Sequence, residues 1–505
     1  MNVQEPCYAD PTLFLMADED LVESAENAAF RICPMDKAPE PVLAPTQPWE
    51  GGDGASPRPV QQDPVVGSVL YDPAEQRFHL WYTAHNNLLS RTSPFAPSLV
   101  PDRAPAVCYA TSRDGLLWEK PALRLVAYEQ SLENNILPSP GPPVKTESMG
   151  VVVLNRVPGL PGRLIRSAWS EFDDPVYPTG ITFLASEDGF HWTPHFPPVL
   201  PLDGDAHCLV WDWHHQCYVC TTRSFVHNRE VAWFRRRGLP HLKQKRHIAV
   251  ARSRDLVHWT PMLPVLEADD RDPENAQLYQ MYVLPYGHGY AGFVQLFYMD
   301  ETMTYGPLDV QLAFSRDLMN WRRVGDRAPI LPRGPSGAWD QSHVSLCANP
   351  PHPEGLRLRF WYGGKDTEHW QSGNGALGTA TLRRDGFACY EAGARWGVVT
   401  TAPMEMQWAT KPFVSVDAAR GEVRVEIVDA ETRKPLEGAG REDCVPIQGD
   451  DALLPVRYGA RRGTWVRHAG RVRFRIHLRQ ARLYALKAPH CRLGDRPGRE
   501  RNLWL

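Results

Sequence analysis

The sequence predicts an all-β protein in which a five-bladed β-propeller is followed by a C-terminal β-sandwich. A short turn motif, S-x-D-x-x-x-W, recurs along the chain, and a strand–turn–strand pattern precedes each copy. Repeated four-stranded units without amphipathic helices between them are typical of propellers. Beyond residue 396 the repeat stops, and apolar and polar residues alternate as they do in half-exposed antiparallel strands.

The turn motif occurs four times with the same end residues and once in a degenerate form. The copies run from Ser112 to Trp118, Ser186 to Trp192, Ser253 to Trp259 and Ser315 to Trp321, and the degenerate copy is Arg383–Phe387. The Asp of such a turn can accept hydrogen bonds from nearby backbone N–H groups, and the Trp can pack back on the blade. We therefore expect these aspartates to be structural rather than catalytic.

A hairpin-like segment precedes each turn motif. The five instances are VGSVLYDPAEQRFHLWYTA, GVVVLNRVPGLPGRLIRSAW, HCLVWDWHHQCYVCTTR, MYVLPYGHGYAGFVQLFY and VSLCANPPHPEGLRLRFWYGG. Two hairpin strands, a third strand that ends in the Asp turn and a fourth strand make one blade of about 60 to 80 residues. The predicted organisation is an extended lead-in over 1–50, the propeller with the active site over 51–396, the sandwich over 397–488 and a tail over 489–505.

Composition narrows the class of protein. Hydrophobic residues make up 43% and charged residues 23% of the 505 residues, as in soluble globular proteins. The net charge of −4 gives no overall electrostatic attraction to nucleic acid or to an anionic membrane. No signal-peptide pattern opens the chain, so we expect a cytoplasmic protein, or a secreted one if the chain has been trimmed. Cys217 and Cys220 are expected to be buried free thiols, and neither a metal nor a cofactor is predicted.

Candidate site residues stand where each blade's first strand begins, because these positions converge on one mouth of a propeller. They are Asp63, Glu147, Asp205 with His207, Glu274 with Gln277, and Asp340 with His343. At any one position, capping of backbone N–H groups explains the residue equally well. Carboxylates gathered around one axis repel each other, however, and such crowding is tolerated where it performs chemistry. Glycosidic cleavage uses a pair: an acid for the leaving oxygen, and a nucleophile or base.

Four further residues are candidates for binding a substrate. Trp49 can stack on a sugar ring or pack on the propeller rim. Arg223 can clamp a carboxylate or phosphate, or pair with a carboxylate of the site. Asp366 and His369 lie in YGGKDTEHW, at the end of the last unit, where a structural histidine is an equal alternative.

The run Gln62-Asp63-Pro64-Val65-Val66-Gly67, followed by SVLYD and FHLWY, resembles the first blade of the five-bladed invertase/fructanase and arabinanase/xylosidase glycoside hydrolases. The overall pattern, with PWEGG, YATSRDGLLWEKP, ENNIL and a closing RRDGF, also resembles a group of uncharacterised bacterial proteins described as glycoside hydrolase family 32-like. The first resemblance implies that Asp63 is the nucleophile or base and that Asp205 stabilises the transition state. The acid of the family falls at Gln277, which cannot donate a proton as an acid, and this leaves Glu147, Glu274 or His343.

The predicted function is that of an exo-acting glycosidase whose substrate is a carbohydrate, with neither nucleic acid nor membrane as a partner. A propeller phosphorylase is the second possibility, with Arg223, His207 and His343 as a phosphate clamp beside one acid. A sugar-binding propeller that has lost its acid is the third. A sialidase would need an Arg triad and a Tyr nucleophile, which the sequence alone does not identify. The oligomeric state stays open.

Overall fold

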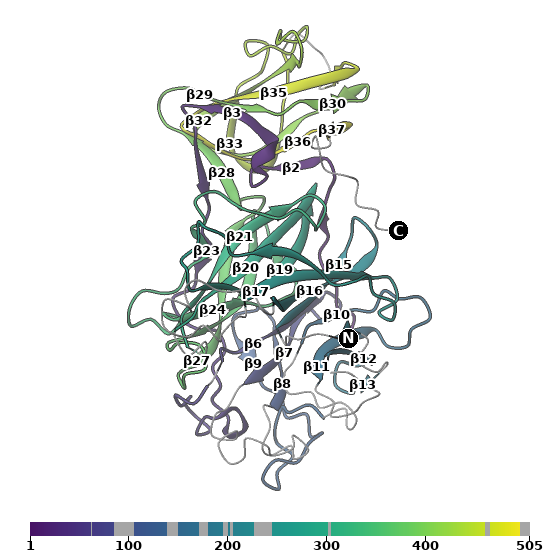
Figure 1. Cartoon of the computed structure of the whole chain (residues 1–505), viewed down its shortest axis with the longest axis vertical. Helices are drawn as coiled ribbons and strands as arrows, with labels where there is room; N and C mark the ends of the chain where they lie inside the picture. Colours follow the sequence, from purple (N-terminus) through teal and green to yellow (C-terminus); the bar gives the residue numbers. More distant parts are fainter. Residues whose placement is uncertain are drawn as a thin grey trace.

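The computed structural model describes residues 1–61, 63–84, 106–138, 150–170, 180–194, 200–201, 206–226, 245–300, 305–459 and 465–494 (Figure 1). Across these ranges the chain forms β-strands and two short 3₁₀ turns, η1 (Glu19–Leu21) and η2 (Pro48–Glu50). The chain is elongated, and a large β-rich body carries a smaller part at one end. We call the eleven-stranded sheet of this smaller part the smaller sheet. None of the described helices is long and apolar enough to cross a membrane.

Three separate sheets follow one another in the large body, and each is antiparallel in chain order. The first contains β6 (Val66–Asp72), β7 (Arg77–Ala84), β8 (Ala106–Ser112) and β9 (Trp118–Glu119). The second contains β10 (Val152–Leu154), β11 (Leu164–Ser170), β12 (Gly180–Ser186), β13 (Thr193–Pro194) and β14 (Leu200–Pro201). The third contains β15 (His207–Asp212), β16 (Cys217–Val226), β17 (Lys245–Ser253) and β18 (Leu263–Glu267). Each sheet corresponds to one predicted hairpin-plus-Asp-turn unit.

The last two predicted units share a single eleven-stranded sheet. One part contains β19 (Ala276–Gly287), β20 (Gly289–Tyr298), β21 (Leu308–Ser315), β22 (Arg322–Arg323) and β23 (Pro329–Leu331). The other contains β24 (His343–Leu346), β25 (His352–Glu354), β26 (Arg357–Lys365) and β27 (Gly375–Arg383). A parallel pair, Leu308 with His343, joins the two parts. The count of five blades therefore stays a prediction.

The Asp turns have the structural role that the motif predicts. The Asp114 Oδ1 atom accepts hydrogen bonds from the backbone N–H groups of Leu116 and Leu117, each at 2.8 Å. Asp188, Asp255 and Asp317 accept the equivalent pairs of bonds in their own turns. Because these carboxylates are occupied by the turns, none of them is a catalytic candidate.

The smaller sheet is built from the end of the chain together with strands from its beginning. Its central order is β3 (Val22–Glu26), β29 (Gly397–Thr401), β35 (Gly470–Arg479), β32 (Phe413–Asp429), β36 (Ala481–Lys487), β28 (Ala388–Ala392) and β4 (Ala29–Ile32). Also paired to it are β2 (Leu13–Leu15), β30 (Met404–Met406), β33 (Ile447–Pro455) and β37 (Cys491–Leu493), and β31 (Ala409–Thr410) pairs with β34 (Val466–Arg467). The two-layer sandwich stays a prediction.

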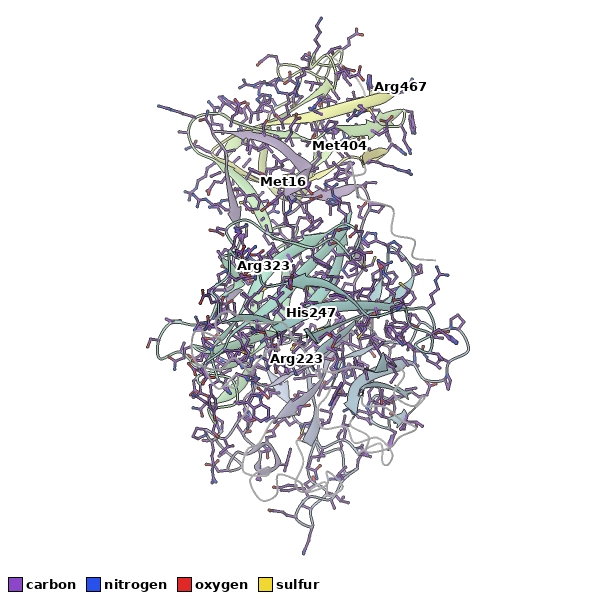
Figure 2. All side chains as sticks on the ribbon, in the orientation of Figure 1. Met16, Arg223, His247, Arg323, Met404 and Arg467 are labelled. Carbon is purple, nitrogen blue, oxygen red and sulfur yellow. The ribbon has the colours of Figure 1, made fainter. Side chains whose placement is uncertain are left out.

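The first fifty residues contribute strands to both parts of the molecule. β1 (Tyr8–Ala9) pairs with β19, and β5 (Asp36–Lys37) pairs with β27. β2, β3 and β4 join the smaller sheet. This segment is thus more than the extended lead-in that its sequence suggests. Figure 2 shows Met16, which follows β2, beside Met404 of the smaller sheet, and both belong to one hydrophobic core.

All ten cysteines are free, and Cys217 and Cys220 are buried in the third sheet. Burial raises the pKa of the Cys217 thiol to about 11, which keeps it protonated and unreactive near neutral pH. The prediction of buried free thiols at these two positions is confirmed.

Candidate functional site

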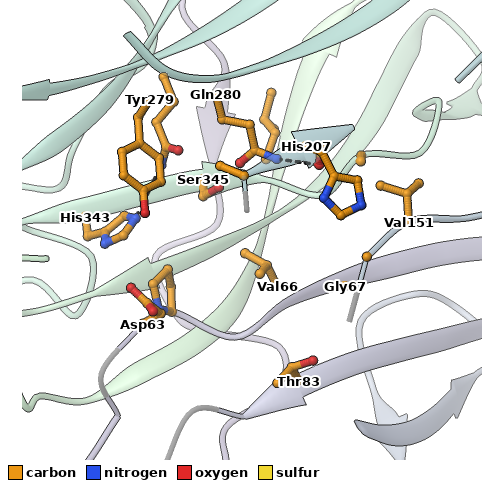
Figure 3. A pocket seen from close by; sticks show the side chains of 16 residues that line it. Asp63, Val66, Gly67, Thr83, Val151, His207, Tyr279, Gln280, His343 and Ser345 are labelled. Atoms are coloured by element: carbon orange, nitrogen blue, oxygen red, sulfur yellow. Dashed lines mark hydrogen bonds between the residues drawn. The ribbon is translucent and has the colours of Figure 1, made fainter. Parts of the chain in front are cut away.

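A cavity of about 170 Å³ lies where the five predicted units meet (Figure 3). Its lining comes from every one of them: Asp63, Pro64, Val66, Gly67 and Thr83; Gly150 and Val151; Ala206 and His207; Tyr279, Gln280 and Gln295; and His343, Ser345, Leu346 and Ala348. Most of these residues stand at or next to the first strand of a unit. We call this space the central cavity.

Asp63 is placed at the cavity by the segment that precedes β6. The backbone of Gln61 exchanges hydrogen bonds of 2.9 and 3.0 Å with Gly373. A Cβ atom on Gly375 would lie 3.0 Å from the Asp63 carbonyl oxygen, so glycine permits this close approach. The Asp63 side chain is 27% exposed, and its Oδ1 atom lies 3.8 Å from His369 Nε2. A carboxylate in this position is open to a substrate.

His369 links Asp63 to Tyr279. The Tyr279 hydroxyl lies 3.1 Å from the His369 Nε2 atom, the same nitrogen that faces Asp63. The guanidinium of Arg223 lies 4.7 Å and that of Arg246 lies 5.6 Å from the centre of the Tyr279 ring. Asp63, His369 and Tyr279 therefore form a connected polar group at one side of the central cavity.

His343 and Lys365, opposite each other in β24 and β26, extend this polar group. Burial, reinforced by His369, holds the pKa of His343 well below its usual value, so the ring is neutral. Its Nε2 atom accepts a hydrogen bond of 3.3 Å from the Gln295 amide. Burial also lowers the pKa of Lys365 to about 8, although Asp63 and Asp366 favour the charged form.

His207 occupies another side of the cavity. Its Nε2 atom lies 3.0 Å from the Ser167 hydroxyl oxygen, and its carbonyl oxygen accepts a hydrogen bond of 3.1 Å from the Gln280 amide (Figure 3). Gly150 makes this arrangement possible, because a Cβ there would lie 2.8 Å from His207 Nε2 and 1.8 Å from the Ser167 carbonyl oxygen. The His207 imidazole and the Gln280 amide are thus fixed at the cavity, where they can form hydrogen bonds to a ligand.

The structure brings three of the predicted site residues into the cavity lining: Asp63, His207 and His343. His369 contacts the lining through Tyr279, and Arg223 stacks on the Tyr279 ring. Glu147 and Asp205 lie outside the described residues.

The other predicted residues are placed away from the lining. Gln277 is buried and accepts a hydrogen bond of 2.7 Å from the Arg246 backbone, and Glu274 is exposed before β19. Asp340 bonds to Lys37. The Trp49 indole donates to Asn135, and the Asp366 carboxylate accepts from Asn374.

Sequence reasoning missed Tyr279, Gln280, Gln295 and Lys365. In β19 the register with β20 shifts between Leu278 and Gln280, where Tyr279 is the inserted residue. Such β-bulges re-aim side chains and are frequent near active sites. A bulge depends on the partner strand, and so the alternation of the sequence does not reveal it.

Asp72, Glu75 and His79 could offer three ligands to a metal ion, at the far end of the β6–β7 hairpin from Asp63. The Asp72 Oδ1 atom, however, accepts hydrogen bonds of 2.9 and 3.2 Å from the backbone of the turn. His79 Nδ1 bonds to the Tyr109 hydroxyl at 2.6 Å. These bonds account for Asp72 and His79 as parts of the hairpin.

No protein-family model and no curated protein matches the chain. Solved structures that resemble it include a glycoside hydrolase (12% identity, 68% of this chain, 92% of that chain, TM-score 0.43). Another is a glycosyl hydrolase from Bacteroides ovatus (14% identity, 70% and 94%, TM-score 0.44). A third is a β-1,2-mannobiose phosphorylase from Listeria innocua (11% identity, 69% and 96%, TM-score 0.43). These are distant resemblances.

Proposed function

We propose that the protein is a glycosidase that hydrolyses O-glycosyl bonds and holds the terminal sugar of an oligo- or polysaccharide in the central cavity. The observation that carries the proposal is the accessible carboxylate of Asp63 in a cavity lined by all five predicted units. Gln280, Gln295 and Ser345 surround it with the uncharged hydrogen-bonding groups that sugar hydroxyls require. A cleft with few, well-placed polar groups suits one sugar ring better than an extended chain.

Asp63 is assigned as the nucleophile or as the base that activates water. Both roles need an ionised carboxylate beside the anomeric carbon, and glycosidases pair it with a proton donor. Glu147 and Asp205 remain candidates for the second carboxyl group, with Asp205 as a transition-state stabiliser. The motif from Gln62 to Gly67 supports a relationship with the family 32-like glycosidases.

The proposed architecture is a five-bladed propeller followed by a β-sandwich, with the boundary set before β28 (Ala388–Ala392), which pairs in the smaller sheet, rather than at the predicted residue 396. Three independent sheets and two strand sets within the eleven-stranded sheet support five blades. The separate hydrophobic core of the smaller sheet supports a second domain. An experimental structure with six blades, or with a single layer after residue 396, would contradict this division.

The experiment is turnover of a panel of 4-nitrophenyl glycosides and natural oligosaccharides by the wild type and by Asp63→Asn. Asn is nearly isosteric but neither a nucleophile nor a base, so kcat should fall by on the order of 10³-fold while the melting temperature is unchanged. Asp270→Asn, at an exposed position outside the cavity lining, is the matched control. Near-normal kcat in Asp63→Asn would remove Asp63 from the mechanism.

A phosphorylase is the second candidate, because Asp63 is the one carboxylate among the described lining residues. A phosphorylase needs a single acid, and phosphate then attacks in place of water. Release of a sugar phosphate that depends on added inorganic phosphate would favour this candidate. Sugar binding without turnover under both conditions would favour the binding protein.

A further inference from the structure

We propose that Tyr279 is the proton donor to the leaving group, and that His369 returns the proton to it from Asp63. This inference rests on the proposed glycosidase function and assigns the acid of that reaction. Three observations carry it: the bulge that places Tyr279, its contact with His369, and the cations on its ring.

The bulge in β19 delivers the phenol to the cavity. Tyr279 is the inserted residue between Leu278 and Gln280, which pair with Leu296 and Gln295 of β20. The insertion leaves Leu278 and Met281 in the same hydrophobic core, so the strand continues undisturbed on that side. In Figure 3 the Tyr279 hydroxyl points into the cavity toward the side of His343 and Asp63. The bulge interrupts the hydrogen-bond ladder between β19 and β20 at one position.

The phenol is connected to the carboxylate through a single nitrogen. His369 Nε2 lies 3.1 Å from the Tyr279 hydroxyl and 3.8 Å from Asp63 Oδ1. His369 is 3% exposed, and its ring packs against Phe297, 4.9 Å away between centroids. The first distance is a hydrogen bond; the second is longer than one, and a small rotation of the Asp63 side chain is required to close it.

Positive charge lies against the face of the Tyr279 ring. The Arg223 and Arg246 guanidiniums stand 4.7 and 5.6 Å from its centre. A nearby cation favours the charged form of an acid, so both guanidiniums stabilise the phenolate that forms as the proton leaves. Tyrosine is an established general acid when a positioned partner supports it.

The proton balance of the reaction closes within this group. As the glycosidic C–O bond breaks, its electron pair goes to the leaving oxygen, which takes the phenolic proton of Tyr279. Water attacks the anomeric carbon and loses a proton to Asp63. That proton passes to His369 Nε2, which carries no proton in the resting state, and Nε2 then donates it to the Tyr279 oxygen. One water is consumed, and every side chain returns to its starting state.

The test compares Tyr279→Phe with the wild type on a natural oligosaccharide and on the matching 2,4-dinitrophenyl glycoside. Loss of a general acid costs about 10²–10⁴-fold on a leaving group that needs protonation. We therefore expect kcat/KM to fall by about that factor on the oligosaccharide and only a few-fold on the activated glycoside. Tyr71→Phe, in β6 and outside the cavity lining, is the matched control and should leave both rates unchanged.

His369→Gln tests the positioning residue with the same readout, since a purely structural defect would lower both rates equally. We expect it to share the leaving-group dependence of Tyr279→Phe. Equal losses on both substrates in Tyr279→Phe, or the leaving-group split in Glu147→Gln instead, would overturn the assignment. Asp63→Asn separates the two levels of the proposal. If it loses both substrates while Tyr279→Phe loses neither, the glycosidase stands and the Tyr279 role fails; if it loses neither, the glycosidase itself fails.

Discussion

The Nζ atom of Lys37 lies 2.6 Å from Oδ2 of Asp340, with 16% and 4% of the two side chains exposed. The same Asp340 oxygen accepts a hydrogen bond of 2.9 Å from the Tyr362 hydroxyl. Lys37 belongs to β5, which pairs with β27, whereas Asp340 precedes β24. The ion pair therefore ties the N-terminal segment to the last predicted blade.

Asp340→Asn should destabilise the protein by about 2–4 kcal/mol, because it leaves the largely buried ammonium of Lys37 without its counter-charge. The activity of the remaining folded protein should be close to that of the wild type. Denaturant unfolding and kcat/KM check the two parts. Glu133→Gln is the control, since both side chains of the Arg124–Glu133 pair are exposed and such pairs contribute little. A large loss of substrate affinity at unchanged stability would restore Asp340 as a binding residue.

Glu274→Gln should leave turnover within about two-fold of the wild type on natural and activated glycosides, because Glu274 is exposed and lies outside the cavity lining. A removed general acid would instead cost about 10²-fold or more. Glu267→Gln, at an exposed position at the end of β18, is assayed in parallel as the matched control. A leaving-group-dependent loss confined to Glu274→Gln would return Glu274 to the mechanism.

The parts of the structure that depend on local chemistry could be predicted from the sequence. The Asp turns close through bonds to residues two and three positions along the chain, so the motif alone reveals them. Asp63 could be found because a strand start in a repeated unit has a defined place in a propeller. His207 and His343 followed from the same rule, and all three line the cavity.

The parts that depend on distant partners could not be predicted. Tyr279 enters the cavity because β19 shifts its register against β20. Gln277, where the family resemblance places the acid, instead accepts a hydrogen bond from the Arg246 backbone. Lys37 and Asp340 are 303 positions apart, and no local pattern announces such a pair. The early strands β2 to β4 are short, and their alternation does not indicate which sheet they join.

Leu15 and Met16 provide a test of how the two parts of the molecule are joined. Leu15 belongs to the core of the large β-rich body, and Met16 to the core of the smaller sheet. Both are fully buried, so Leu15→Ala and Met16→Ala should each cost about 2–5 kcal/mol through the cavity left behind.

The two variants should differ in which part opens first under native-state hydrogen exchange. Met16→Ala should raise exchange first in β35 and β36, and Leu15→Ala first in β19 and β20. Leu117→Ala, whose side chain is 77% exposed, is the control and should change neither. Identical exchange patterns in both variants would show that the two cores unfold as one unit.

Asp309 predicts how stability changes with pH. Burial raises its pKa from 3.8 to about 6, against the opposing effects of Arg333 and of a hydrogen bond from Tyr298. Because the folded pKa lies above the unfolded one, the native state binds more protons between these values, and stability falls as pH rises through this window. A difference of this size corresponds to at most about 3 kcal/mol at neutral pH.

Asp309→Asn keeps the acceptor for the Tyr298 hydroxyl, 3.2 Å away in the wild type, and removes the titration. Its melting temperature should match the wild type near pH 4 and exceed it progressively from pH 5 to 7. A difference that is constant over this range, or a wild type that is the more stable at pH 7, would show that Asp309 is ionised without penalty in the folded protein.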